Sequence, residues 1–204
     1  ISFEPSLVKR CMDWHMEEES VHHRTECSSK DYYNDHGDLQ ARGGYLGDFH
    51  FKTRYLFKNT GKGLGSRIFF ESGLIIPSNN TLVADPYFLD HDPAPDEDDH
   101  RHFAVSDGSY KGIFGIEYSM KRLSYPVFWS IFSNIQYPLA ENKYKFLSPV
   151  NYSLSFIALS GPFNHRDTKQ LKLVSVGLSL SIKHSTYSKW HGINSPNSKS
   201  TAIT

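Results

Sequence analysis

The chain has 204 residues with 22 Lys and Arg against 22 Asp and Glu, and this zero formal charge argues against a nucleic-acid-binding protein, which would carry a basic stripe. The length suits one ordinary domain, and an aromatic content of 14% excludes a disordered chain. The mean hydropathy of -0.49 excludes a bundle of membrane helices but leaves a membrane barrel open, because barrel strands alternate lipid-facing and lumen-facing residues.

Residues 1–45 are predicted to form an external loop that carries cysteines and histidines. The chain begins at Ile1 without a basic and apolar leader, which fits a removed signal peptide or a start inside a longer chain. Residues 1–9 are a candidate end of a preceding strand, although Pro5 weakens that assignment. Cys11 and Cys27 are candidates for one disulfide in an oxidising compartment, with thiolate ligation of a metal as the alternative.

Six runs of residues alternate apolar and polar side chains with the period of a β-strand. In the first run, at 48–58, Phe49, Phe51 and Tyr55 share one face and the charged residues share the other. A glycine-rich turn at 59–65 then leads to the second run. The five later runs lie at about 66–76, 110–122, 127–137, 147–159 and 170–183. Such strands of about 9–11 residues are long enough to cross a bilayer.

The connections between these runs differ in length at the two ends. The turns at 59–65, 123–126 and 160–169 are short and share one end, whereas the long acidic, histidine-containing loop at 77–109 belongs to the other. Bacterial outer-membrane barrels combine short periplasmic turns with longer external loops. We therefore expect barrel strands over 46–184, followed by an external loop over 185–204 that ends in a candidate start of another strand.

Aromatic residues gather near both ends of the predicted strands. One group lies near the short turns and the other near the long loops, as the two interfaces of a membrane require. The first group is Tyr55, Phe57, Tyr125 and Trp129, and the second is Tyr45, Tyr110, Tyr137 and Tyr144.

Two segments carry a family resemblance. Residues 47–57, in which Gly-Asp precedes an alternating strand with Tyr and Phe, resemble a recurring segment of bacterial outer-membrane barrels assigned to transport, among them the family named for the meta pathway of phenol degradation. Residues 73–78 are similar to that family's strand end, but Ser-Asn follows Pro77 where the family has Thr-Gly. The likeness covers roughly residues 46–183. It implies a barrel fold, an outer-membrane location and a transport role, and it carries over no catalytic residue.

Six strands are too few to close a membrane barrel, for which eight is the usual minimum. The sequence therefore predicts an all-β, antiparallel, up-and-down transmembrane β-barrel of about eight to twelve strands, some of them missing from this chain.

Histidines and carboxylates concentrate on the predicted external side. Residues 90–102 combine six carboxylates with three imidazoles, ligands that suit Zn, Cu or Ni. A solvated acidic surface is the alternative. The metal-ligand candidates are His15, His22, His23, His91, His100 and His102.

Charged residues on the polar face of the strands would line the lumen of the barrel. They form either a salt-bridge network that fills a narrow barrel or a selectivity lining for a small solute. These residues are His50, Lys52, Arg54, Arg67, Glu71, Glu117 and Lys121.

The expected function is passage or surface capture of a small solute or metal ion in the bacterial outer membrane. We expect the lipid bilayer and lipopolysaccharide, with other outer-membrane subunits, as partners, no nucleic acid and no enzymatic activity, because no catalytic motif is present. One alternative is a non-transporting structural or interaction barrel within a larger assembly. The other is a soluble secreted β-protein that binds a ligand.

Overall fold

The computed structural model describes residues 1–11, 27–91, 100–124, 127–161 and 175–204. Across these ranges the chain forms β-strands, turns and irregular segments, and no helix in them is long and apolar enough to cross a membrane. The prediction of an all-β, antiparallel fold is confirmed.

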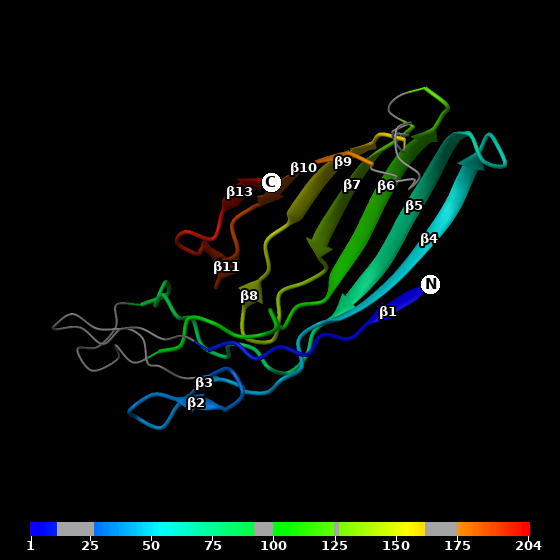
Figure 1. The fold of residues 1–204 in the computed structure, drawn as a ribbon. Helices are drawn as coiled ribbons and strands as arrows, with labels where there is room; N and C mark the ends of the chain where they lie inside the picture. Colours follow the sequence, from blue (N-terminus) through cyan, green and yellow to red (C-terminus); the bar gives the residue numbers. More distant parts are fainter. Residues whose placement is uncertain (12–26, 92–99, 125–126, 162–174) are drawn as a thin grey trace, which may run out of the picture.

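One large sheet organises the described part of the chain. It has eight strands in the order β1-β4-β5-β6-β7-β9-β10-β13, and every neighbouring pair is antiparallel. Figure 1 shows a curved sheet with β1 and β13 at opposite edges, so within the described residues no closed barrel is seen. The strands are β1 (Ser2–Glu4), β4 (Phe49–Asn59), β5 (Gly65–Ile76), β6 (Lys111–Lys121), β7 (Phe128–Pro138), β9 (Asn151–Leu159), β10 (Gly177–Ser185) and β13 (Ser200–Ile203).

Two of the six predicted runs begin later than expected. The fifth was expected from about residue 147, but β9 begins at Asn151 because Pro149 has no backbone N–H to donate to the ladder. Phe146 and Leu147 instead form β8, which pairs with β11 (Lys189–Trp190). The sixth run was expected from residue 170, and β10 begins at Gly177. Residues 170–174 of that run lie outside the described residues.

The candidate strand segments at the two chain ends lie at the two edges of the sheet. β1 pairs with β4, with Ser2 opposite Lys52 and Glu4 opposite His50. Pro5 follows β1 directly, at a position where the missing N–H ends the ladder. β13 pairs with the last part of β10, and the Thr204 N–H and carbonyl both bond to Ser181.

The connections divide the sheet into a short-turn end and a loop end. The strand ends joined by the β4–β5, β6–β7 and β9–β10 connections lie at the short-turn end. The β9–β10 connection covers residues 160–176 and is longer than the turn expected at 160–169, and residues 162–174 lie outside the described residues. The described parts of the segments after β5, β7 and β10 build a cap at the loop end, together with the described part of the segment before β4 (Figure 1). The cap holds a two-stranded sheet, β2 (Tyr32–Tyr33) with β3 (Leu39–Ala41), and a three-stranded sheet of β8 (Phe146–Leu147), β11 (Lys189–Trp190) and β12 (Ile193–Asn194).

Buried apolar side chains are few and lie toward the loop end. In the described residues, the fully buried hydrophobic set is Tyr32, Ala41, Ile75, Ile113 and Trp190. Trp190 packs against Phe146 in the cap, with ring centroids 5.0 Å apart. Within the described residues, the large sheet therefore buries few apolar side chains, Ile75 on β5 and Ile113 on β6 among them.

A sheet in a soluble protein buries its apolar face, but in the large sheet the apolar face is the exposed one. Phe114 is 60% exposed while its neighbour Ile113 is 1% exposed, and Ile131 is 41% exposed while Ser130 is 6% exposed. The face that carries Phe114 and Ile131, here called the apolar face, is the exposed one. It also includes Phe3, Phe51, Tyr55, Phe70, Leu74, Ile116, Tyr137, Leu154, Leu178, Leu180, Ile182 and Ile203, all exposed. We call the opposite side the polar face.

Candidate binding surfaces

The charged residues predicted to line a lumen share the polar face. Strand register places Arg54 opposite Glu71, and Arg67 opposite Ser119. Alternation along β4, β5 and β6 then brings the whole set to one side of the sheet: His50, Lys52, Arg54, Arg67, Glu71, Glu117 and Lys121.

Arg54 and Glu117 form the central ion pair of this face. The Arg54 guanidinium also lies over the ring of Phe69, 4.0 Å from its centroid. On its other oxygen, Glu117 accepts a hydrogen bond from Ser130 Oγ at 3.1 Å. The network thus joins β4, β5, β6 and β7 across the polar face.

The remaining charged residues have different roles. Lys52 Nζ lies 2.9 Å from Glu4 Oε2 and ties the edge strand β1 to β4. Arg67 donates to the carbonyls of Gly61 and Gly63, at 3.4 and 3.2 Å, so it holds the β4–β5 turn. Lys121 is exposed at the short-turn end. Salt bridges therefore engage Lys52 and Arg54, whereas Arg67 bonds to backbone carbonyls.

The other half of the polar face is built from hydroxyl and amide groups. Ser153 Oγ donates to Asn134 Oδ1 at 2.8 Å, and Ser185 Oγ donates to Asn151 Oδ1 at 2.7 Å. These side chains and Lys183 line a cavity of about 580 Å³ between β7 and β13. The polar face thus combines a charged half over β4–β6 with a mostly uncharged half over β7–β13.

A polar network that sequence reasoning missed lies where the polar face meets the cap. Lys111 is buried and pairs with Asp107, which also accepts from Ser148 Oγ at 3.2 Å. Next to it, Ser106 Oγ donates to Asp48 Oδ1 at 2.5 Å. Burial raises the pKa of the Asp48 carboxyl, and the bond from Ser106 only partly opposes this. Lys111 has the same alternation as Glu117 and Lys121, so that pattern, continued to the strand end, would have found it.

Cys11 and Cys27 are joined by a disulfide, and the chain has no free cysteine. The bond closes a loop with a sequence separation of 16. The Arg10 N–H donates to Ser28 Oγ and the Ser28 N–H to the Arg10 carbonyl, so backbone bonds reinforce the link. Neither sulfur is then a thiolate ligand.

Among the described histidines, His100 and His102 come together. Their Nε2 atoms are 2.7 Å apart, and Phe88 lies edge-on to His100 with a centroid separation of 4.7 Å. His91 is placed beside Asp90, with Nδ1 to Oδ1 at 2.7 Å. His15, His22 and His23 lie outside the described residues. No group of three or more His, Cys, Asp or Glu that could hold a metal gathers within the described ranges.

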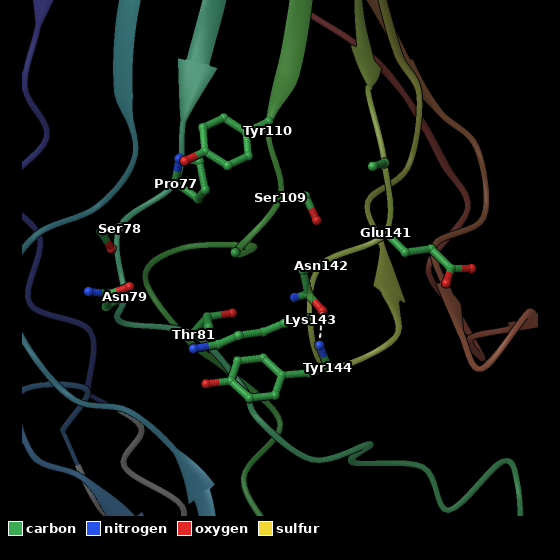
Figure 2. Close-up of a pocket in the computed structure, with 12 residues that line it drawn as sticks. Pro77, Ser78, Asn79, Thr81, Ser109, Tyr110, Glu141, Asn142, Lys143 and Tyr144 are labelled. Carbon is green, nitrogen blue, oxygen red and sulfur yellow. Dashed lines mark hydrogen bonds between the residues drawn. The ribbon is translucent and has the colours of Figure 1, made fainter.

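A second cavity, of about 300 Å³, lies at the loop end between the segments after β5, before β6 and after β7. Figure 2 shows Tyr110 and Pro77 at one end of it and Tyr144 at the other. Asn142 shapes one wall, because its Oδ1 accepts from the backbone N–H groups of Tyr144 and Phe146 at 2.8 and 3.1 Å.

The fold and its faces define an all-β chain whose antiparallel sheet exposes apolar side chains on one side and polar side chains on the other. No protein-family profile, no curated protein and no solved structure matches the chain. The resemblance to phenol-degradation barrels stays a prediction from the sequence.

Proposed function

We propose that the chain forms the wall of a bacterial outer-membrane β-barrel whose polar face lines a path for a small hydrophilic solute. The observation that supports this proposal is the exposure of the two faces of the large sheet. Apolar side chains are exposed on one face, while Ser119 and Ser130 are buried on the other. A soluble sheet buries its apolar face, whereas a membrane barrel turns that face to lipid and its polar face to the lumen.

The length of the strands supports the proposal. β4, β6 and β7 each have 11 residues. At about 3.3 Å per residue and a tilt of about 40°, such strands span about 28 Å, close to the apolar band of about 25 Å on known barrels. Tyr55 and Phe57 near one end and Tyr137 near the other are exposed, as aromatic girdles require.

Backbone groups at the edge of the sheet are left unpaired, and this determines whether the proposed barrel must close. β1 covers only residues 50–52 of β4, so β4 presents residues 53–59 along an unpaired edge within the described structure. Unpaired backbone groups are costly in hydrocarbon, and only a closed barrel removes them. The proposal therefore includes strands that pair with both edges.

The polar face indicates the kind of solute. Lys52 and Arg54 are paired with Glu4 and Glu117. With Arg67, Lys121 and Glu71 also counted, the charged half carries four cations against three carboxylates and so has a small net charge. The half over β7–β13 offers hydroxyl and amide groups. We propose small polar solutes of low charge, the lipid bilayer with lipopolysaccharide as the surroundings, and a role without catalysis.

Two measurements test the proposal. Folded membrane barrels resist SDS until they are heated, so the protein should migrate differently in boiled and unboiled samples. Reconstituted protein should then let liposomes swell in isotonic solutions of small neutral solutes. Shifted migration without swelling would favour the structural or interaction barrel, and unshifted migration would favour the soluble ligand-binding β-protein.

Capture of a divalent metal is a second candidate, and the approach of the His100 and His102 Nε2 atoms favours it. Their 2.7 Å separation is that of a hydrogen bond, whereas two nitrogens on one Zn²⁺, each at about 2.0–2.1 Å, lie about 3.3 Å apart. Zn²⁺ would replace the shared proton and spread the rings slightly. Calorimetry with Zn, Cu and Ni should show binding that His102→Ala weakens at least tenfold, and binding no tighter than millimolar would exclude capture.

A further inference from the structure

The loop-end cavity of Figure 2 contains a buried hydroxyl without a partner. Ser109 is 1% exposed, and its Oγ has no hydrogen-bond partner within the described residues. Burying a hydroxyl without a partner costs free energy, which a ligand that bonds to it would recover. The buried Ser109 hydroxyl is therefore evidence for a polar ligand in this cavity.

The walls of the cavity add a flat aromatic surface. Tyr110 is 54% exposed and lies at the end next to Pro77, whereas Tyr144 lies at the other end beneath Lys143 (Figure 2). Lys143 Nζ is 4.9 Å from the Tyr144 ring centroid, so that ring is partly covered. Tyr110 is left as the ring that can pack against the C–H face of a ligand.

The polar groups around this space are mostly uncharged. Thr81 is buried opposite Ser109, and the exposed Asn79 lies on the side of the cavity away from Ser109 (Figure 2). The Glu141 carboxylate points away from the cavity (Figure 2), and the Lys143 ammonium lies over the Tyr144 ring, 4.9 Å from its centroid. A hydroxyl both donates and accepts, so this lining matches a ligand that is itself rich in hydroxyls.

Gly108 fixes the shape of the cavity. Its φ is +68°, a conformation that side chains rarely adopt, and a Cβ there would lie 2.9 Å from both Asn142 Nδ2 and Thr81 Oγ1. The backbone that leads into Ser109 can therefore pass close to Thr81 and Asn142. The volume of about 300 Å³ is at the lower end of the usual range of about 300–1,000 Å³ for ligand pockets, which suits one sugar-sized ring.

We propose that this cavity binds a glycosyl ring, with Ser109 Oγ bonded to a ring hydroxyl and Tyr110 packed on its C–H face. This inference rests on the proposed function in one respect, which is that the cavity lies at the external loop end of a membrane protein. There the ring would come from a free saccharide or from the head group of a glycolipid, and both present the same hydroxyls.

The test measures binding to the detergent-solubilised protein by saturation-transfer NMR and calorimetry. The free probes are the methyl glycosides of glucose, galactose and mannose. The lipid probe is mixed micelles of detergent and phosphatidylethanolamine with or without monogalactosyl diacylglycerol. We expect at least one probe to bind and Ser109→Ala to weaken it about fivefold, as for one lost hydrogen bond. Binding of a free glycoside assigns the saccharide source, and binding to the galactolipid micelles alone assigns the lipid source.

Ser195→Ala is the matched control, because Ser195 Oγ is also buried without a partner within the described residues but lies outside this cavity. It should leave binding unchanged, whereas Asn79→Ala, at an exposed site that leaves the fold intact, should weaken it. Equal effects of Ser109→Ala and Ser195→Ala, no binding of any probe, or binding of inorganic phosphate alone would overturn the inference. Liposome swelling is measured separately, so failure of the transport proposal leaves this result unaffected.

Discussion

Arg54 pairs with Glu117, two strands away, rather than with Glu71, which the register places directly opposite it. The guanidinium reaches Glu117 diagonally across β5 because the ring of Phe69 lies beneath it, at 4.0 Å. A cation over an aromatic face gains electrostatic energy that an open cross-strand pair lacks. The polar face is therefore held together by a pair that spans three strands.

We predict a measurable coupling energy between Arg54 and Glu117. In a double-mutant cycle with Arg54→Met and Glu117→Gln, the coupling should be about 0.5–1.5 kcal/mol, because Arg54 is half exposed and solvent screens the pair. Urea unfolding in lipid vesicles provides the free energies. The same cycle between Arg54 and Glu71 is the control and should give a coupling close to zero. A larger value for Glu71 would contradict the geometry.

Leu154 and Ser155 are neighbours on β9 that face opposite sides of the sheet, and they test the membrane proposal directly. Leu154→Arg places a charge on the exposed apolar face and should cost about 2–4 kcal/mol of unfolding free energy in a bilayer. Ser155→Arg turns the same side chain toward the polar face and should cost much less. In a soluble protein, Leu154→Arg would be nearly neutral because the position is already exposed, so equal tolerance of both changes argues for the soluble alternative.

The disulfide in the segment between β1 and β4 should stabilise the folded protein. Cys11→Ser with Cys27→Ser should lower the free energy of unfolding by about 3 kcal/mol, since the bridge restricts the unfolded chain over a loop with a sequence separation of 16. Thiol labelling of the unreduced, denatured protein should detect no free cysteine. Labelling of both cysteines would show instead that the sulfurs are available to a metal.

Much of the fold could be predicted because strand alternation is a local property. The face that carries Phe114 and the face that carries Glu117 follow directly from period-two spacing, and the antiparallel order follows from the short turns. The start of β9 could not be placed, because Pro149 breaks the alternating run within an otherwise favourable stretch.

The sites depend on contacts between distant segments, and these could not be predicted. Glu71 is the obvious partner of Arg54 by register, and only the position of Phe69 redirects the pair. The cavity around Ser109 joins three loop segments whose approach requires the conformation of Gly108. Neither the Arg54–Glu117 pair nor the Ser109 cavity produces a sequence motif within one segment of the chain.

Asp48 should make stability fall as the pH rises. Burial raises the pKa of its carboxyl in the folded state, so the folded protein holds this proton more tightly than the unfolded chain does. Its contribution to stability is therefore present below the ordinary carboxyl pKa of about 3.9 and is lost as the pH rises through the raised folded value. Asp48→Asn keeps the oxygen that accepts from Ser106 Oγ and removes the ionisation.

We therefore expect Asp48→Asn to be more stable than the wild type at pH 7 and to lose this advantage at acidic pH. Ser106→Ala removes a hydrogen bond that favours the charged carboxylate, so it should steepen the loss of stability with rising pH. Urea unfolding of the three proteins across a pH series measures both effects. If Asp48→Asn is less stable than the wild type at pH 7, the carboxylate is stabilised by Lys111 more than it is penalised by burial, and the sign of the prediction is wrong.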